Sequence, residues 1–160
     1  MIRITVLCVG KLKEKFYIDG AAEYLKRLRP YCKCEVVELP EERLSGDPSP
    51  AQIESALARE GEAIRSRLPS GSSVVALCVE GKLRSSEELA GLLSDWAQGG
   101  SKHLAFVIGG SHGLHPSIKE QAWLKLSMSP MTFPHHLARV MLLEQIYRGF
   151  KIQEGSRYHK

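Results

Sequence analysis

A glycine-rich segment, Gly109-Gly110-Ser111-His112-Gly113, directly follows the apolar segment 104–108. Glycine lets a ligand approach the backbone closely and permits positive φ angles, and parallel α/β sheets bind ligands where their strands end. The spacing does not match G-x-G-x-x-G, and G-x-x-x-x-G-K-[ST] is absent, so a dinucleotide site has weak support and a P-loop has none. The residues leave two interpretations open, a tight turn and a ligand-binding loop.

Polar side chains also interrupt the apolar segment near the C-terminus. Arg139, Glu144 and Arg148 lie within residues 135–150, where most other side chains are apolar. Glu144 and Arg148 are four residues apart, which is also the spacing of an ordinary ion pair on a helix. The terminal Tyr158-His159-Lys160 is typical of a frayed chain end.

No metal site is predicted. His135 and His136 stand where the last helix is expected to begin, and no H-E-x-x-H or comparable pattern accompanies them. The cysteines contain no C-x-x-C pair and are typical of small buried apolar residues. They are Cys8, Cys32, Cys34 and Cys78.

The elements that must position these residues alternate between strand and helix along the whole chain. This alternation predicts one α/β domain over residues 1–160, with a mostly parallel sheet and helices on both faces. Capping boxes at Ser49–Gln52 and Ser85–Glu88 mark two helix starts. The expected strands are 2–9, 34–39, 74–79, 104–108 and 124–128, and the expected helices are 16–28, 50–68, 86–98, a short one from 116, and 135–150. Gly81 is expected to break the chain after the third strand, and residues 151–160 are expected to be irregular.

The charge distribution is uneven. Residues 1–30 carry a net charge of +4, residues 31–133 carry −3, and residues 134–160 carry +3. If the two basic ends meet on one face, that face can hold phosphates; a solvated surface of mixed charge explains the same numbers. The chain shows no signal segment and no apolar run of membrane-spanning length, so we expect a cytoplasmic protein.

The helix expected over residues 135–150 is apolar around most of its circumference. Such a helix is usually buried on two sides. Because it lies at the end of a small domain, a second subunit is the favoured cover, which predicts a homodimer. The alternative is a helix covered by its own chain.

Several short motifs together resemble a known family. They are Leu77-x-x-x-Gly81-Lys82, Ile108-Gly109-Gly110-x-x-Gly113-Leu114, Met131-Thr132-Phe133-Pro134-His135, Arg139, Glu144-Gln145-x-Tyr147-Arg148 and Tyr158-His159-Lys160. Their order and spacing, over essentially the whole chain, resemble the ribosomal large-subunit methyltransferase H family of the SPOUT methyltransferases.

The resemblance implies a C-terminal trefoil knot, contrary to the usual rule against threaded chains. It implies S-adenosylmethionine bound bent in that knot, and a homodimer whose active sites borrow residues from the neighbouring subunit. It implies N3-methylation of a pseudouridine in large-subunit (23S) ribosomal RNA within the assembled ribosome. The cofactor-binding residues it implies are Leu77, Gly109, Met128, Ser129, Pro130, Met131, Thr132 and Phe133.

Methyl transfer from a sulfonium is chiefly a matter of positioning, and an imide nitrogen reacts better when a base or a cation favours its anion. We therefore expect substrate orientation and charge stabilisation from four side chains, and proton acceptance from Glu144 or His135. The four are Arg139, Arg148, Tyr158 and His159. Without a separate RNA-binding domain, affinity must come from a dimer surface and the basic ends, which include Arg3, Lys11, Lys13 and Lys15.

Two other functions remain compatible with the residues alone. One is a non-catalytic RNA-binding protein that uses the same basic ends. The other is a small-molecule α/β enzyme that binds a nucleotide at the turn beginning with Gly109, although the phosphate fingerprint is missing.

Overall fold

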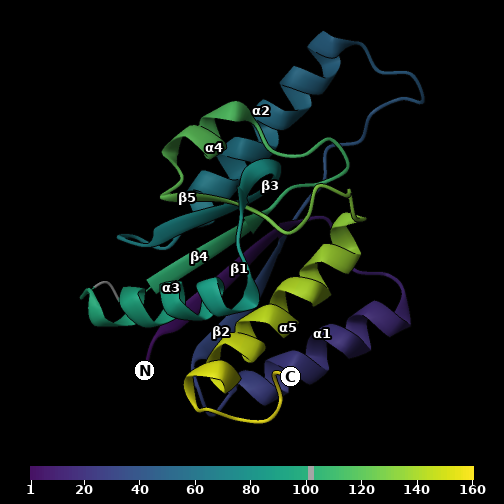
Figure 1. Ribbon diagram of the computed structural model, residues 1–160. Coiled ribbons are helices and arrows are strands. Elements are labelled where there is room, and N and C mark those ends of the chain that lie inside the picture. Colours follow the sequence, from purple (N-terminus) through teal and green to yellow (C-terminus); the bar gives the residue numbers. More distant parts are fainter. Residues whose placement is uncertain (101–102) are drawn as a thin grey trace.

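The computed structural model describes residues 1–100 and 103–160. Five strands form one sheet in the order β2-β1-β4-β3-β5, and all neighbouring strands are parallel (Figure 1). The strands are β1 (Arg3–Val9), β2 (Lys33–Leu39), β3 (Ser73–Leu83), β4 (His103–Ile108) and β5 (Leu124–Ser127). The helices are α1 (Lys15–Leu28), α2 (Pro50–Arg67), α3 (Ser86–Gln98), α4 (Pro116–Gln121) and α5 (His135–Gln153).

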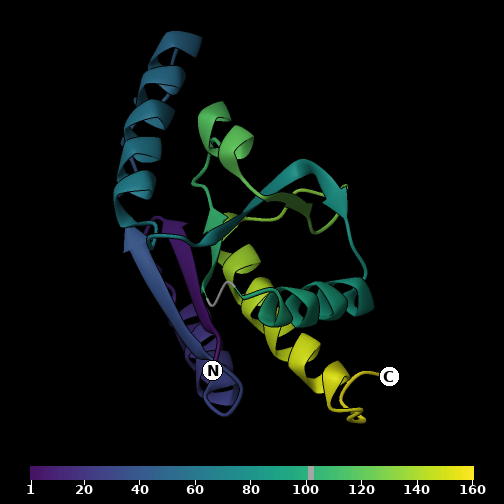
Figure 2. The same ribbon diagram turned by 90° about the vertical axis from the view of Figure 1, so that its left-hand side faces the viewer.

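Helices cover both faces of this sheet, as the alternating pattern predicts (Figure 2). Helices α1, α3 and α5 pack on one face through side chains such as Leu28, Leu93 and Leu142. Helices α2 and α4 pack on the other face through Ile64 and Ile118. The α/β class, the parallel sheet and the two-sided cover are confirmed.

Strand β1, which lies between β2 and β4, is buried on both faces. Its Ile4, Val6 and Cys8 side chains belong to the core under α1, α3 and α5, whereas Leu7 and Val9 belong to the core under α2 and α4. Successive side chains of a strand point to opposite faces. This explains why an almost continuous apolar segment serves two separate cores.

Local signals explain where helices α2 and α3 begin. Ser49 accepts a hydrogen bond from the Gln52 amide, and the Gln52 side chain accepts one from the Ser49 amide. Ser85 and Glu88 form the same reciprocal pair at α3. Both predicted capping boxes are therefore confirmed.

The prediction that Gly81 breaks the chain after the third strand is wrong for the extent of the strand, which continues past Gly81, although its pairing is interrupted just before Lys82. Strand β3 continues to Leu83, and its pairing with β5 shifts register between Leu77 and Lys82. A Cβ at position 81 would lie 2.8 Å from the backbone of Lys125 and Leu126. Glycine is needed here because the two strands approach closely. Leu126 pairs with both Leu77 and Lys82, so residues 78–81 bulge out and interrupt the pairing without ending the strand.

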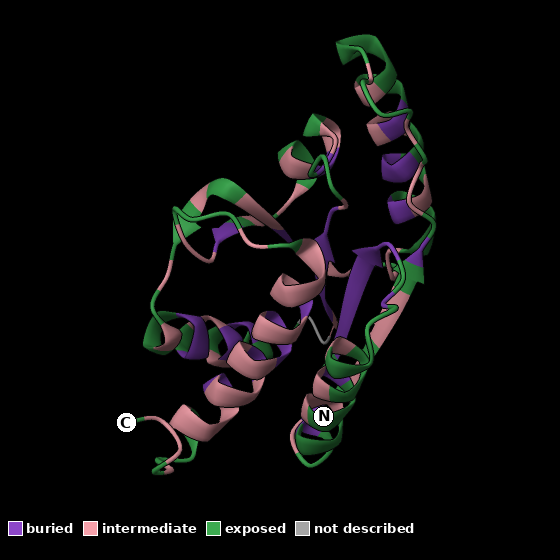
Figure 3. Ribbon diagram, turned by 90° about the vertical axis from the view of Figure 1, so that its right-hand side faces the viewer, coloured by how far each residue is buried: buried purple, intermediate pink, exposed green. Residues whose placement is uncertain are grey.

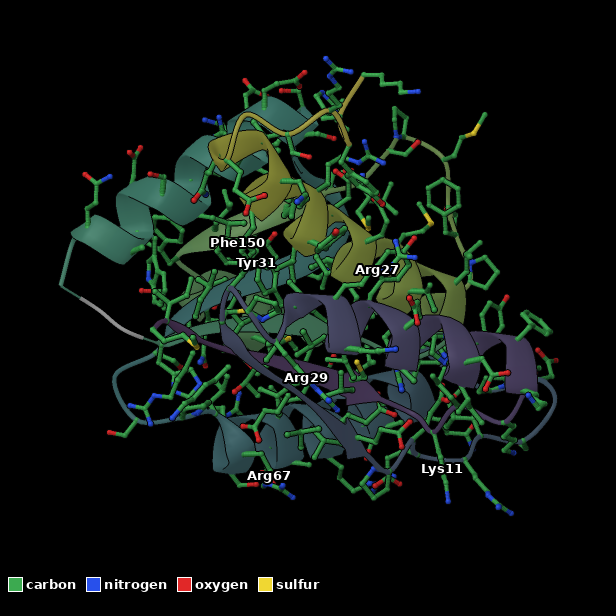
Figure 4. All side chains as sticks on the ribbon, turned by 90° about the horizontal axis from the view of Figure 1, so that it is seen from below. Lys11, Arg27, Arg29, Tyr31, Arg67 and Phe150 are labelled. Atoms are coloured by element: carbon green, nitrogen blue, oxygen red, sulfur yellow. The ribbon has the colours of Figure 1, made fainter. Side chains whose placement is uncertain are left out.

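Helix α5 is longer than predicted: it ends at Gln153, whose side chain donates to the Ala90 carbonyl of α3 at 3.0 Å. The Tyr31 and Phe150 rings stack with centroids 5.4 Å apart near the end of α1 (Figure 4). Much of α5 is only partly buried (Figure 3). The apolar circumference of this helix is thus incompletely covered by its own chain.

Within residues 1–100 and 103–160, none of the helices is both long enough and apolar enough to cross a membrane.

Candidate active site

A cavity of about 680 Å³ opens where strands β3, β4 and β5 end. The turn 109–113 forms one part of its wall, and the segment after β5 forms another. Apolar side chains from the strand ends, among them Ile108 and Leu126, form the floor. We call this space the first cavity; it lies where parallel α/β sheets bind ligands.

Almost all of the residues expected to bind a cofactor line the first cavity. They are Leu77, Gly109, Met128, Ser129, Met131, Thr132 and Phe133. Pro130 is not among the lining residues, although both of its neighbours are. His135, one of the two proposed proton acceptors, lines the same cavity.

The turn 109–113 is tight, and it also borders the cavity. A Cβ on Gly109 would lie 2.3 Å from the Gly113 carbonyl oxygen, and Gly113 has a φ of +80°. The Gly113 amide donates to the Gly110 carbonyl at 3.1 Å. The two interpretations left open by the sequence are therefore compatible, because closing the turn requires glycine and leaves its backbone on the cavity wall.

The segment after β5 is organised by its own serines. The Ser127 hydroxyl donates to the Ser129 carbonyl at 3.1 Å, and the Met131 amide donates to the Ser129 hydroxyl at 3.0 Å. Met131 itself is 73% exposed. The segment thus has a defined backbone with side chains facing solvent, which suits recognition through backbone groups.

Glu41, which the sequence did not single out, ties the turn to the start of α5. Its Oε1 accepts hydrogen bonds from the Ser111 amide at 2.8 Å and the Ser111 hydroxyl at 2.9 Å. Its Oε2 lies 3.7 Å from Nε2 of His135. Burial alone would raise the pKa of Glu41, but these hydrogen bonds and the nearby histidines outweigh it and lower the pKa. Glu41 therefore remains an anion at neutral pH and holds two walls of the first cavity.

Arg139 is tied to the strand ends beside Glu41. Its guanidinium donates to Oε2 of Glu38 at 2.6 Å and to the Gly10 carbonyl at 3.0 Å, and the Arg139 side chain is 2% exposed. The Leu12 amide donates to the same Glu38 oxygen at 2.9 Å. We call Gly10, Glu38, Glu41, Ser111, His135 and Arg139 the anchor cluster. It binds the first turns of α5 to the ends of three strands.

His135 is uncharged at neutral pH. Burial lowers its pKa, the neighbouring His136 lowers it further, and Glu41 opposes the shift. The two imidazole rings have centroids 4.2 Å apart. A neutral imidazole has one nitrogen able to accept a proton, so His135 has the protonation state that a general base needs.

The C-terminal half of α5 holds a second polar group. Oε1 of Glu144 accepts two hydrogen bonds from Arg148, at 2.9 and 2.6 Å, and one from the Tyr158 hydroxyl at 3.0 Å. The Arg148 guanidinium also lies over the Tyr158 ring, 4.8 Å from its centroid. Burial, followed by the Glu144 carboxylate, raises the pKa of Tyr158 to about 12, so the hydroxyl keeps its proton at neutral pH.

The C-terminal residues are ordered by these contacts, so the expectation of a frayed end is wrong. Arg148 can only donate, so Nδ1 of His159, 3.2 Å away, accepts. This leaves Nε2 to donate to Glu87 of α3 at 2.7 Å. We call Glu87, Glu144, Arg148, Tyr158 and His159 the tail cluster.

The candidate catalytic residues are thus divided between two places. Arg139 and His135 belong to the anchor cluster, whereas Glu144, Arg148, Tyr158 and His159 belong to the tail cluster. Arg148 lies nine positions after Arg139, which corresponds to a rise of about 14 Å along the helix axis. Among residues 1–100 and 103–160, no three His, Cys, Asp or Glu side chains are placed to hold a metal ion.

Comparisons with known proteins agree on one family. A sequence profile described as "Predicted SPOUT methyltransferase" matches residues 2–159. Two proteins named "Ribosomal RNA large subunit methyltransferase H", from Moorella thermoacetica and Desulforamulus reducens, are 50% and 47% identical to this chain over 160 residues, covering 100% of both chains in each case. A protein of the same name from Streptococcus equi subsp. zooepidemicus is 45% identical over 159 residues, covering 99% of this chain and 100% of its own.

Solved structures show the same fold at low sequence identity. A probable methyltransferase from Bordetella pertussis superposes with a TM-score of 0.58 at 16% identity, covering 92% of this chain and 96% of its own. A probable methylase family protein from Haemophilus influenzae superposes with a TM-score of 0.54 at 16% identity, covering 99% of this chain and 70% of its own.

Proposed function

Since the chain belongs to the SPOUT methyltransferase family, we propose that it methylates a base of large-subunit ribosomal RNA with S-adenosylmethionine as the methyl donor. More specifically, the acceptor is N3 of a pseudouridine in 23S RNA, and the substrate is the assembled ribosome. The names of the full-length relatives support the RNA class. The observation that carries the proposal is the first cavity. The turn 109–113 and the segment 128–133 are apart in the sequence, and both line this cavity, where a donor can bind between them.

The residues of the first cavity fit S-adenosylmethionine. Leu77, Ile108 and Leu126 offer apolar walls for an adenine ring, and the turn 109–113 offers backbone where a side chain would not fit. The Glu80 carboxylate also lines the cavity, where it forms an ion pair with Lys119. When bound, the donor supplies a methyl group already activated by its positive sulfur. In this proposal Leu77, Gly109 and residues 128–133 hold the donor largely through backbone groups.

The tail cluster supplies orientation and charge for the acceptor. We assign to Arg148, Tyr158 and His159 the task of orienting the acceptor RNA and stabilising the negative charge that develops during the reaction. Arg139 is buried against Glu38, so we assign to it the task of fixing α5, from which the other side chains project.

Two side chains are candidates for accepting the imide proton. His135 is neutral at pH 7 and lines the first cavity. The Glu144 side chain is 17% exposed, but its Oε1 already accepts three hydrogen bonds. The variants His135→Gln and Glu144→Gln distinguish the two candidates when the rate is measured as a function of pH. The residue that accepts the proton is the one whose replacement removes the fall in rate at low pH.

The remaining parts of the proposal concern architecture and location. We propose a single SPOUT domain over residues 1–160 with a C-terminal trefoil knot, acting as a cytoplasmic homodimer. The partly exposed apolar side chains of α5 support the dimer. The basic ends support binding to the ribosome; Lys11 near the end of β1 points outward from the underside of the molecule (Figure 4).

Two measurements test the function. Isothermal titration is expected to show that the purified protein binds S-adenosylmethionine, and nucleoside mass mapping is expected to show that cells lacking the protein lose one methylated pseudouridine in large-subunit RNA. Restoring the gene restores the modification. A non-catalytic RNA-binding protein would leave the titration flat, and a small-molecule enzyme would leave the ribosomal RNA unchanged. Either result would overturn the proposal.

A further inference from the structure

A second cavity, of about 490 Å³, adjoins the first on the side of α1, α3 and α5. The two cavities share Leu126, Ser127 and Met128, where β5 passes into the segment expected to hold the donor. Methyl transfer requires the attacking atom to lie directly beyond the methyl carbon, in line with the bond that breaks. An acceptor must therefore enter through a space that borders the donor site, and the second cavity is such a space.

The walls of the second cavity suit a nucleobase. Tyr24 offers an aromatic ring, and Leu89 and Met141 offer apolar side chains, which can hold the faces of a flat ring. Glu144 of the tail cluster lines the same space. The cavity thus combines surfaces for stacking with a polar rim, as do pockets that receive a base taken out of its stack.

Arg84 supplies the feature that points to a ligand. Its side chain borders the second cavity, and its Nε is buried without a hydrogen-bond partner among residues 1–100 and 103–160. A buried donor without a partner destabilises the protein unless a ligand or water accepts its hydrogen bond. A guanidinium presents its donors as a planar fork that matches oxygen atoms on one edge of a ring.

We propose that the second cavity receives the target base of the RNA, with Arg84 donating hydrogen bonds to the carbonyl oxygens of its imide edge. This inference rests on the proposed function and adds the place where the acceptor binds. Arg84 stabilises the imide edge as it loses its proton, because negative charge then spreads onto those oxygens. The base stacks beside Tyr24, and its imide edge faces the boundary formed by Leu126, Ser127 and Met128.

The first test replaces Arg84 and measures donor and acceptor separately. Arg84→Gln is expected to lower kcat/KM for ribosomes about 30-fold, the cost of a lost hydrogen bond to a charged group. The dissociation constant for S-adenosylmethionine, measured by titration, is expected to stay within about twofold of the wild-type value. Arg84→Lys, which keeps the charge, is expected to recover part of the activity. Arg67→Gln, at the exposed end of α2 on the other side of the sheet (Figure 4), serves as the matched control.

A second variant keeps the test decisive if Arg84 proves important for folding. The Ser86 hydroxyl, on the rim, donates to Gln145 at 2.6 Å. Ser86→Phe fills the second cavity without touching the first, so it is expected to abolish methylation of ribosomes and to leave donor binding intact. Thermal unfolding verifies that both variants are folded.

The outcomes separate this inference from the proposed function. Full activity in Arg84→Gln or in Ser86→Phe overturns the assignment of the second cavity, and so does a matching loss of donor affinity. A wild-type protein that neither binds the donor nor methylates ribosomes refutes the proposed function, and this inference with it.

Discussion

In the two halves of α5, an arginine pairs with a glutamate at the same distance, 2.6 Å, in very different surroundings. Arg139 of the anchor cluster is 2% exposed, and its partner Glu38 lies 101 residues away along the chain. Arg148 of the tail cluster is 24% exposed, and its partner Glu144 lies one helical turn away. The same chemical pair is thus a link between distant elements in one place and a local contact in the other.

This difference shows that burial and sequence separation, rather than distance, decide what an ion pair does. A buried arginine with a distant partner stabilises the fold, because losing it leaves a partly buried carboxylate without its counterion. A partly exposed pair on one helix contributes little stability, and its groups remain able to rearrange around a substrate. We therefore expect substitutions in the anchor cluster to affect stability and donor binding, and substitutions in the tail cluster to affect turnover.

The largest effect is expected for Arg139→Gln. This change leaves Glu38 and the Gly10 carbonyl without a charged donor, and we expect a loss of about 3 kcal/mol in the free energy of unfolding. Urea denaturation of the wild type and the variant gives this number directly. A loss below about 0.5 kcal/mol, the range of ordinary surface changes, would show that the anchor cluster is no more important for stability than the tail cluster.

Arg148→Gln is expected to have the opposite profile. Turnover on ribosomes falls about 30-fold, because a cation beside the reacting base is lost. The free energy of unfolding changes by less than about 1 kcal/mol. Steady-state kinetics and urea denaturation on the same preparation measure both quantities. If Arg148→Gln were both inactive and strongly destabilised, the anchor cluster and the tail cluster would not differ in their contributions to stability and turnover.

Glu41→Ala tests whether the anchor cluster also shapes the donor site. Without Glu41, the Ser111 amide and hydroxyl lose their acceptor, and we expect the affinity for S-adenosylmethionine to fall about tenfold as the turn becomes less ordered. Titration calorimetry gives the dissociation constant. Glu42→Ala is the control, since Glu42 pairs on the surface with Arg59 at 3.4 Å. Equal affinities in both variants would contradict the role of Glu41.

Tyr158→Phe removes only the hydroxyl that donates to Glu144. The ring still packs under Arg148, so we expect turnover to fall about fivefold, the effect of one hydrogen bond. Donor affinity should stay unchanged. His159→Gln offers a second probe of the same end, and normal turnover in both variants would exclude the C-terminal residues from the reaction.

The smallest expected effect is a dependence of the free energy of unfolding on pH in the acidic range. Burial would raise the pKa of Glu38, but hydrogen bonds from Arg139 and the Leu12 amide outweigh it and lower the pKa below the ordinary 4.5. The stability contributed by this carboxylate is therefore complete above pH 4.5 and is lost as the pH falls from there through the folded-state pKa. The stability difference between wild type and Arg139→Gln should narrow between pH 6 and pH 3. A difference that stays constant over this range would show that Glu38 is not coupled to Arg139.

Local patterns predicted the parts of the molecule that depend on neighbouring residues. The capping boxes at Ser49 and Ser85, the five strands and the helices on both faces all arise from contacts or periodicities within a few residues. Where the backbone of a distant strand matters, local patterns were incomplete: Gly81 permits the close approach of β5, and β3 continues to Leu83 after its pairing is interrupted at residues 78–81.

The candidate site was predicted unevenly for the same reason. The resemblance indicated the residues that line the first cavity, but periodicity gave no sign of Glu41, whose partner Ser111 is 70 residues away. The polar C-terminal residues were expected to fray because their partners, Glu144 on α5 and Glu87 on α3, lie outside any local window. A side chain that acts through a distant contact carries no signal in its own neighbourhood.

The pairing of β1 has a consequence for biosynthesis. This strand is translated first, yet one of its two neighbours in the sheet is β4, in which His103 pairs with Arg3. About 100 residues must therefore be made before the hydrogen bonds along that edge can form. Until then the nascent chain exposes an unpaired edge of a mostly apolar strand, the kind of surface that promotes aggregation. Contacts of such long range also slow folding, so the growing polypeptide has particular need of chaperones during the first two thirds of its synthesis.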